Sequence, residues 1–154
     1  MLKTPRTPIA RAILLVAPAM ALALGVVLWG ANRGYARETV APLLSTGKTI
    51  LDQPFAYPVG KPPKVTAVIV TMQPGDQTGW HEHEVPFFAY ILDGEVSVDY
   101  GPHGKRVYRK GDALMEAIDT AHDGRNTGEG VTRILAVFMG AEGVPNTVNV
   151  APPK

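Results

Sequence analysis

The sequence predicts an all-β fold, a sandwich or barrel of short strands, from three observations. The chain of 154 residues holds 16 glycines and 14 prolines, which favours many turns over long helices. Its body consists of short runs that are rich in β-branched and aromatic residues. Turn residues separate these runs at intervals of about 8–12 positions, which is typical of sandwiches and barrels.

Composition and charge exclude some classes of function. Cysteine is absent, so the chain has no disulfide framework and no thiol chemistry. Residues 1–31 carry Lys3, Arg6 and Arg11 and no acid, whereas the rest of the chain holds 12 basic and 14 acidic residues. A near-neutral, slightly acidic body argues against nucleic-acid binding, which normally requires a basic face.

The N-terminal segment has the character of a membrane anchor. Residues 12–31 form an uncharged run that is rich in Ala, Leu and Val and follows a basic segment. About 20 apolar residues in a helix span the ~30 Å hydrocarbon core. We therefore expect a single transmembrane helix within residues 1–31, lying in the lipid bilayer of the inner membrane, with the rest of the chain on the periplasmic side.

A cleaved signal peptide is the alternative, with Gly34-Tyr35-Ala36 as the candidate cleavage site. The apolar run is longer than the roughly 7–15 residues of most signal peptides, which favours the anchor. The alternative would leave a protein secreted to the periplasm, so both hypotheses place the body outside the cytoplasm.

The body divides into an arm, a barrel and a tail. Residues 32–64 read as a linker and extended arm, with four prolines between positions 53 and 64. Residues 65–140 hold the expected strands of the barrel, and residues 141–154 form an extended C-terminal tail. The expected strands begin with the β-branched run 65–72 and continue with 87–92, 95–99, 106–109, 113–116 and 132–139. Asp93-Gly94 provides a tight hairpin turn between the second and third of these runs.

Three of the four histidines stand at positions that suit a shared metal ion. His81 and His83 are two apart, so in a strand both imidazoles point to the same face of the sheet. His122 can add a third imidazole from a paired strand. The fourth, His103, lies in a Gly-Pro-His-Gly turn, and we expect it to be solvated.

The spacing around these histidines forms two recognisable rows. In the first, Gly75 is followed by five residues, His81-x-His83, three residues, Phe87, six residues and Gly94. In the second, Gly111 is followed by five residues, Ala117, one residue, Asp119, two residues, His122, three residues and Asn126. These rows resemble the two motifs of the cupin superfamily, G-x5-H-x-H-x3-4-E-x6-G and G-x5-P-x-G-x2-H-x3-N. The resemblance covers residues 65–140 and implies the cupin double-stranded β-helix, a jelly-roll barrel.

Two departures from the motifs bear on the site that the resemblance implies. Phe87 occupies the place of the ligating glutamate, which leaves a metal site of three histidines: His81, His83 and His122. Glu84 directly follows His83 and points to the other face of a regular strand, so only a bulge would return it to the site. Ala117 and Asp119 replace the motif's proline and glycine, a change that we expect to affect only a turn. In the family, the asparagine at the position of Asn126 is usually structural.

Our leading hypothesis is a membrane-anchored periplasmic cupin-domain protein that binds a divalent metal ion, with Fe, Mn, Zn, Ni and Cu as candidates. The resemblance to quercetinase-type single-domain cupins implies a dioxygenase-like oxidoreductase that acts on a small organic molecule. The sequence identifies no separate acid–base pair beside the histidines and assigns no catalytic residue. The chemistry would therefore rest on the metal as Lewis acid or redox centre.

The second hypothesis is a non-catalytic accessory subunit of a larger membrane protein complex, with the barrel as a docking or cap module. Binding of a small ligand without turnover is compatible with the same barrel. A homodimer is common for this architecture, although the sequence does not determine the oligomeric state.

Overall fold

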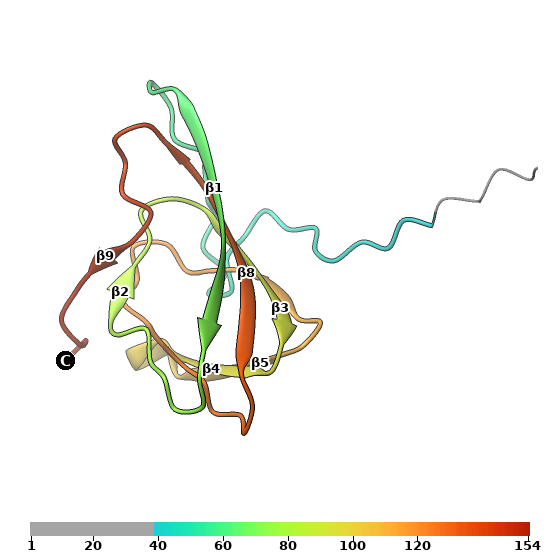
Figure 1. The fold of residues 1–154 in the computed structure, drawn as a ribbon. Helices are drawn as coiled ribbons and strands as arrows, with labels where there is room; N and C mark the ends of the chain where they lie inside the picture. The colour runs from blue at the N-terminus through green and yellow to red at the C-terminus, as the bar shows by residue number, and fades with distance from the viewer. Residues whose placement is uncertain (1–38) are drawn as a thin grey trace, which may run out of the picture. The chain divides into compact units, whose positions relative to one another are not determined.

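Nine β-strands and one short 3₁₀ helix make up the regular structure of residues 39–154, which are the residues that the computed structural model describes (Figure 1). The expected all-β fold is confirmed. In chain order the elements are β1 (Pro63–Met72), β2 (His81–Glu82), β3 (Phe87–Asp93), β4 (Glu95–Asp99), η1 (Gly101–His103), β5 (Lys105–Arg109), β6 (Ala113–Met115), β7 (Asp123–Arg125), β8 (Thr132–Ala141) and β9 (Val148–Asn149).

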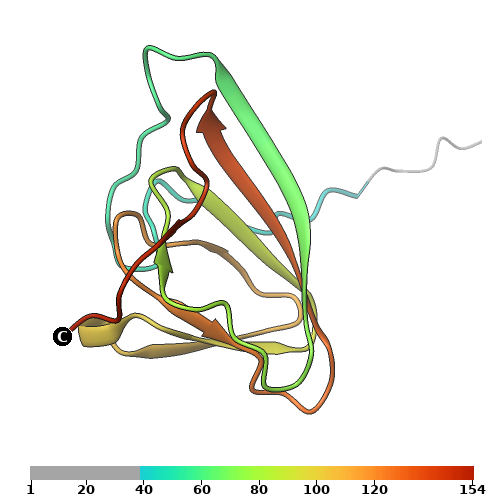
Figure 2. The same ribbon diagram turned by 60° about the vertical axis from the view of Figure 1, so that its left-hand side comes forward.

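The strands form three antiparallel sheets. The largest has the order β1-β8-β3-β6, the second has the order β5-β4-β7, and β2 pairs with β9 in a short third sheet. Figures 1 and 2 show these strands wrapped around one interior. The long pairing of β1 with β8 brings the two ends of the predicted barrel segment together, because Pro63 pairs with Ala141 and Met72 with Thr132.

Alternation along the strands fills the interior with apolar side chains. In β3 the side chains of Ala89 and Ile91 are buried, whereas Tyr90 between them is only half-buried. In β4 the buried residues are Val96 and Val98, again two apart. The largest core cluster joins these positions to Met72 and to buried residues of β5 and β6.

The hairpin turn between β3 and β4 depends on one glycine. Gly94 has a φ of 76°, in the left-handed region that side chains with a Cβ rarely adopt. A Cβ atom at this position would lie 2.6 Å from Oγ1 of Thr132, so the turn also has no room for a larger residue. The predicted Asp93-Gly94 turn thus fixes where β4 leaves the large sheet.

The arm before the barrel is packed against it in part. Residues 49 to 53 form a turn in which the amide of Ile50 donates a hydrogen bond to the carbonyl of Met115 in β6. Residues 41–154 accordingly cluster as one unit of the chain.

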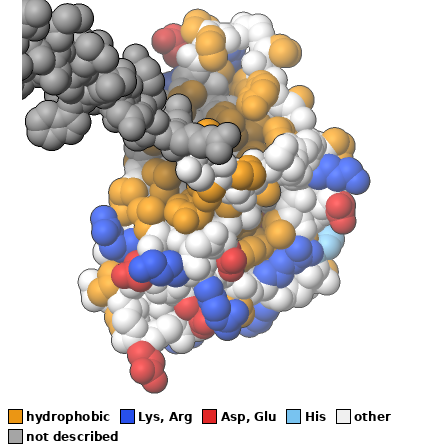
Figure 3. Space-filling view, turned by 90° about the vertical axis from the view of Figure 1, so that its right-hand side faces the viewer, with side chains coloured by type: hydrophobic (Ala, Val, Ile, Leu, Met, Phe, Trp, Pro, Cys, Tyr) orange, Lys and Arg blue, Asp and Glu red, His pale blue; other side chains and the backbone are white. Residues whose placement is uncertain are grey.

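The predicted transmembrane segment, residues 12–31, lies outside the described residues. Within residues 39–154 no helix has the length and hydropathy needed to cross a membrane. On the face shown in Figure 3, hydrophobic side chains gather in the upper half and charged side chains in the lower half.

Candidate metal centre

A β-bridge places two of the three histidines side by side. The amide of His81 donates to the carbonyl of His122 (3.0 Å), and the amide of His122 donates to the carbonyl of His81 (2.9 Å). This reciprocal pair of hydrogen bonds sets the two residues directly opposite each other, and their ring centroids lie 4.4 Å apart. The bridge joins the two motif rows that are separated by a hairpin in the sequence.

His83 enters the same site from just beyond β2. Its carbonyl accepts a hydrogen bond from the amide of Asp119 (3.0 Å), and its ring centroid lies 5.0 Å from those of His81 and His122. Asp119 has a φ of 48°, the left-handed conformation that the motif's glycine would adopt easily. The departure at Asp119 therefore keeps the turn that holds His83, as the sequence predicted.

Backbone carbonyls fix the tautomer of all three imidazoles. Nδ1 of His81 contacts the carbonyl of Gly79 (2.7 Å), Nδ1 of His83 that of Asn146 (2.8 Å), and Nδ1 of His122 that of Thr120 (2.8 Å). A carbonyl oxygen can only accept, so each Nδ1 carries the proton and each Nε2 keeps a lone pair.

The three imidazoles each offer a ligand nitrogen, and these atoms all lie within 4.8 Å of one another. In His83 and His122 the Nε2 atoms are buried and have no hydrogen-bond partner among residues 39–154. Basic nitrogens that converge in this way suit a divalent transition metal, and the carbonyl partner of each Nδ1 is typical of metal-ligating histidines. The residues present therefore fit a metal ion held by three histidines.

Burial keeps these imidazoles neutral. It lowers the pKa of His83 to about 3 and is also the main cause that lowers the pKa of His81 and of His122. The backbone hydrogen bond at each Nδ1 opposes the shift without cancelling it. Neutral imidazole is the form that binds a metal, so the site is ready for an ion at neutral pH.

Phe87 and Glu84 both lie as the sequence predicted. The ring of Phe87 stands 4.6 Å from the ring of His83 and stacks on Phe138, so an aromatic pair occupies the place of the motif's carboxylate. Glu84 is exposed and is not part of the histidine cluster. His103, in η1, is exposed as well.

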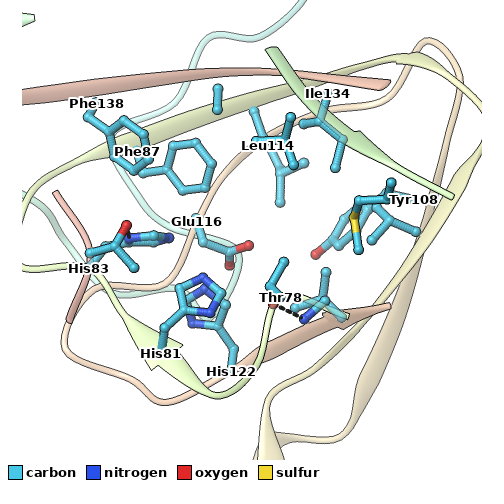
Figure 4. A pocket seen from close by; sticks show the side chains of 18 of the residues that line it. Thr78, His81, His83, Phe87, Tyr108, Leu114, Glu116, His122, Ile134 and Phe138 are labelled. Carbon is cyan, nitrogen blue, oxygen red and sulfur yellow. Dashed lines mark hydrogen bonds between the residues drawn. The ribbon is translucent and has the colours of Figure 1, made fainter. Parts of the chain in front are cut away.

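A cavity of about 240 Å³ adjoins the three histidines inside the barrel (Figure 4). Its wall is mainly apolar and comes from β1, β3, β4, β6 and β8. The side chains that form this wall include Val70, Phe87, Ile91, Leu114, Ile134 and Phe138. A mostly apolar cavity with a few converging polar groups is the usual form of a small-molecule site.

Sequence reasoning identified no acid–base pair beside the histidines and missed a carboxyl group that lies in this cavity. Glu116 lines the cavity and is only 4% exposed. Tyr100 donates a hydrogen bond to Oε1 of Glu116 (2.7 Å), and the hydroxyl of Tyr108 lies 3.1 Å from that of Tyr100. The single acidic residue in the apolar stretch 113–118 was the available signal.

The pKa values of these three groups follow from their burial. Burial raises the pKa of the Glu116 carboxyl, while the hydrogen bonds from Tyr100 and from the amide of Ala117 oppose that change. Burial also raises the pKa of Tyr100 and raises that of Tyr108 to about 12. Both phenols therefore keep their protons at neutral pH and act as hydrogen-bond donors.

Comparison with known proteins agrees with this fold. Residues 68–138 match the family model described as Cupin domain. No curated protein matches the sequence. The match supports the cupin superfamily, and the expected cupin-like barrel is confirmed to that extent.

Two solved structures illustrate the likeness. The DMSP lyase DddQ from Ruegeria pomeroyi is 23% identical with a TM-score of 0.50, over 67% of this chain and 49% of that chain. An oxalate decarboxylase from Lactobacillus farciminis, in its formate complex, is 22% identical with a TM-score of 0.49, over 56% of this chain and 26% of that chain. The chain thus spans about half of the lyase and about a quarter of the decarboxylase, and at these identities the likeness concerns the fold alone.

Proposed function

We propose that the barrel binds one divalent metal ion through His81, His83 and His122. The observation that carries this proposal is the orientation of the three rings. In each ring, Nδ1–H donates a hydrogen bond to a backbone carbonyl and Nε2 keeps its lone pair free. A buried acceptor without a partner costs about 1–3 kcal/mol, and two of the three Nε2 atoms are in that condition. One metal ion would satisfy all three atoms together.

The three imidazole donors favour a metal ion of the first transition series or zinc. Imidazole suits Fe, Ni, Cu and Zn, and Mn less well. The bound ion would supply Lewis-acid or redox chemistry at its open side. Because three neutral histidines leave the divalent charge uncompensated, the open side favours water, hydroxide or an oxygen group of an organic ligand.

The ligand that we propose is a small organic molecule held in the cavity beside the histidines. The apolar wall would hold its apolar body and exclude water, whereas the polar end of the cavity would orient its oxygen groups. The hydroxyl of Tyr100 donates a hydrogen bond to Glu116 and is itself within hydrogen-bond distance of the hydroxyl of Tyr108, so a phenol proton lies close to the carboxyl group. For the reaction class we propose a dioxygenase-like oxidation of this molecule.

We further propose that residues 12–31 anchor the chain in the inner membrane, with the barrel on the periplasmic side. The support is the uncharged apolar run of 20 residues that follows three basic side chains.

Elemental analysis tests the metal proposal directly. Full-length protein purified without added metal is expected to carry close to one equivalent of a single transition metal. The variant His83→Ala should lose it, because a tetrahedral or octahedral site with two protein ligands is weak. His103→Ala is the matched control, since His103 is exposed in η1 and should leave the metal content unchanged.

Equal metal content in the wild-type protein and in His83→Ala would contradict metal binding at this site. Absence of metal from the wild-type protein, together with stable co-purification with membrane proteins, would favour the accessory-subunit hypothesis instead.

A further inference from the structure

Glu116 lines the cavity, and a hydrogen bond fixes the position of its backbone. It directly follows β6, and its amide donates a hydrogen bond to the carbonyl of Phe87 (2.8 Å). Figure 4 shows its carboxyl group between the histidines and the apolar wall. Glu116 thus lies beside the residue that occupies the motif's glutamate position.

The two oxygens of this carboxyl group differ in their surroundings. Oε1 accepts hydrogen bonds from the hydroxyl of Tyr100 (2.7 Å) and from the amide of Ala117 (2.8 Å). Oε2 has no hydrogen-bond partner among the described residues. The protein therefore holds the group by one oxygen and leaves the other for a molecule in the cavity.

Glu116 provides negative charge that the three histidines lack. Three neutral imidazoles provide no negative charge for a divalent cation, and Phe87 removes the carboxylate that the motif would supply. Among the described residues that line the cavity, Glu116 is the single acidic one. It does not belong to the group of ligand atoms within 4.8 Å of one another, which consists of His81, His83 and His122.

We propose that Glu116 is the anionic residue of this metal centre, acting on the molecule at the open side of the ion rather than on the ion itself. Its Oε2 accepts a hydrogen bond from that molecule, which is water or an organic ligand with a hydroxyl group. This inference rests on the metal binding proposed above and adds to it the polarity of the ligand. Burial alone raises the pKa of this carboxyl group, but the positive charge of the bound ion favours its ionised form. The resulting carboxylate disfavours a second anion and favours a hydroxyl donor.

The substitution Glu116→Gln isolates this role from a structural one. Glutamine has the same shape and keeps an oxygen for the donors Tyr100 and Ala117, but it carries no negative charge. Zn²⁺ affinity is measured on the full-length protein by competition with a chelator of known affinity. We expect Glu116→Gln to bind Zn²⁺ roughly 10–100-fold more weakly, the usual effect of losing a residue just outside the ligand set. Glu129→Gln is the control, because Glu129 is exposed, and its affinity should be unchanged.

The outcomes separate the two proposals. If the wild-type protein binds no Zn²⁺ at the histidines, metal binding and the role of Glu116 are both overturned. If the wild-type protein and Glu116→Gln bind Zn²⁺ equally well, only the role of Glu116 is overturned.

A second measurement applies even if Glu116→Gln does not fold. A crystal structure of the Zn²⁺-loaded wild-type protein should place Oε2 within hydrogen-bond distance of a non-protein ligand of the ion. Direct coordination of the ion by Oε2, or an Oε2 bonded to another protein group, would overturn the inference.

Discussion

Burial of the three imidazoles makes the stability of the metal-free protein depend on pH. In the unfolded chain they titrate near pH 6.5, whereas burial lowers the pKa of His83 to about 3 and also lowers the pKa of His81 and His122. Between these pH values the unfolded chain binds more protons than the folded one. The free energy of unfolding should therefore fall as the pH is lowered from about 6.5 toward 3, by about 1.4 kcal/mol per pH unit for each extra proton.

Urea denaturation of the metal-free protein at pH 7 and pH 5 checks this dependence. Glu116 acts in the opposite direction, since burial raises its pKa and its contribution is lost as the pH rises. The three histidines outnumber it, so the net slope should keep the predicted sign. Replacement His83→Leu should flatten the slope and His103→Ala should not. A metal-free protein that is equally stable at both pH values would contradict the burial of neutral imidazoles.

At the scale of the elements, the arm before β1 supports the loop that carries His122. The side-chain amide of Gln53 donates hydrogen bonds to the carbonyl of Ile118 (2.9 Å) and to the hydroxyl of Thr120 (3.1 Å). The amide of Ile118 donates in return to the side-chain oxygen of Gln53 (3.2 Å). The carbonyl of Thr120 accepts the hydrogen bond from Nδ1 of His122. The contacts of Gln53 with this loop therefore help to set the orientation of the His122 ring.

We expect Gln53→Ala to weaken metal binding several-fold while the barrel stays folded, because the freed loop lets the His122 ring turn away. Chelator competition measures the affinity, and thermal unfolding of the metal-free protein reports the fold. Lys48→Ala, at an exposed residue of the same arm, is the control. Unchanged affinity in Gln53→Ala would show that the loop holds His122 without the arm.

The sequence predicted the parts of this site that depend on neighbours along the chain. The side-chain direction of His81 and His83 and the turn at Gly94 follow from local strand and turn geometry. Gln53 could not be predicted, because it is separated from Ile118 by 65 positions. The same holds for the carbonyl of Asn146, which reaches His83 from the expected tail, where β9 pairs with β2. Such contacts arise only when distant segments fold together, and no periodicity marks them.

At the scale of the whole molecule, the proposed location of the barrel depends on whether residues 12–31 form an anchor. If residues 12–31 are an uncleaved anchor, the full-length chain should remain in the membrane fraction after a carbonate wash. A chain that lacks residues 1–38 should appear in the soluble fraction. A wild-type protein that is found in the soluble periplasm, with its N-terminus removed near residue 36, would support the cleaved signal instead.

The proposed metal centre consists of one metal ion held by His81, His83 and His122. Anomalous diffraction from crystals of the Zn²⁺-loaded protein, recorded at the zinc absorption edge, tests this most directly. We predict one strong peak with the three Nε2 atoms about 2.0–2.1 Å from it, the usual length of a zinc–imidazole bond. A map without a peak at the histidines, or with its only peak elsewhere on the chain, would contradict the metal centre.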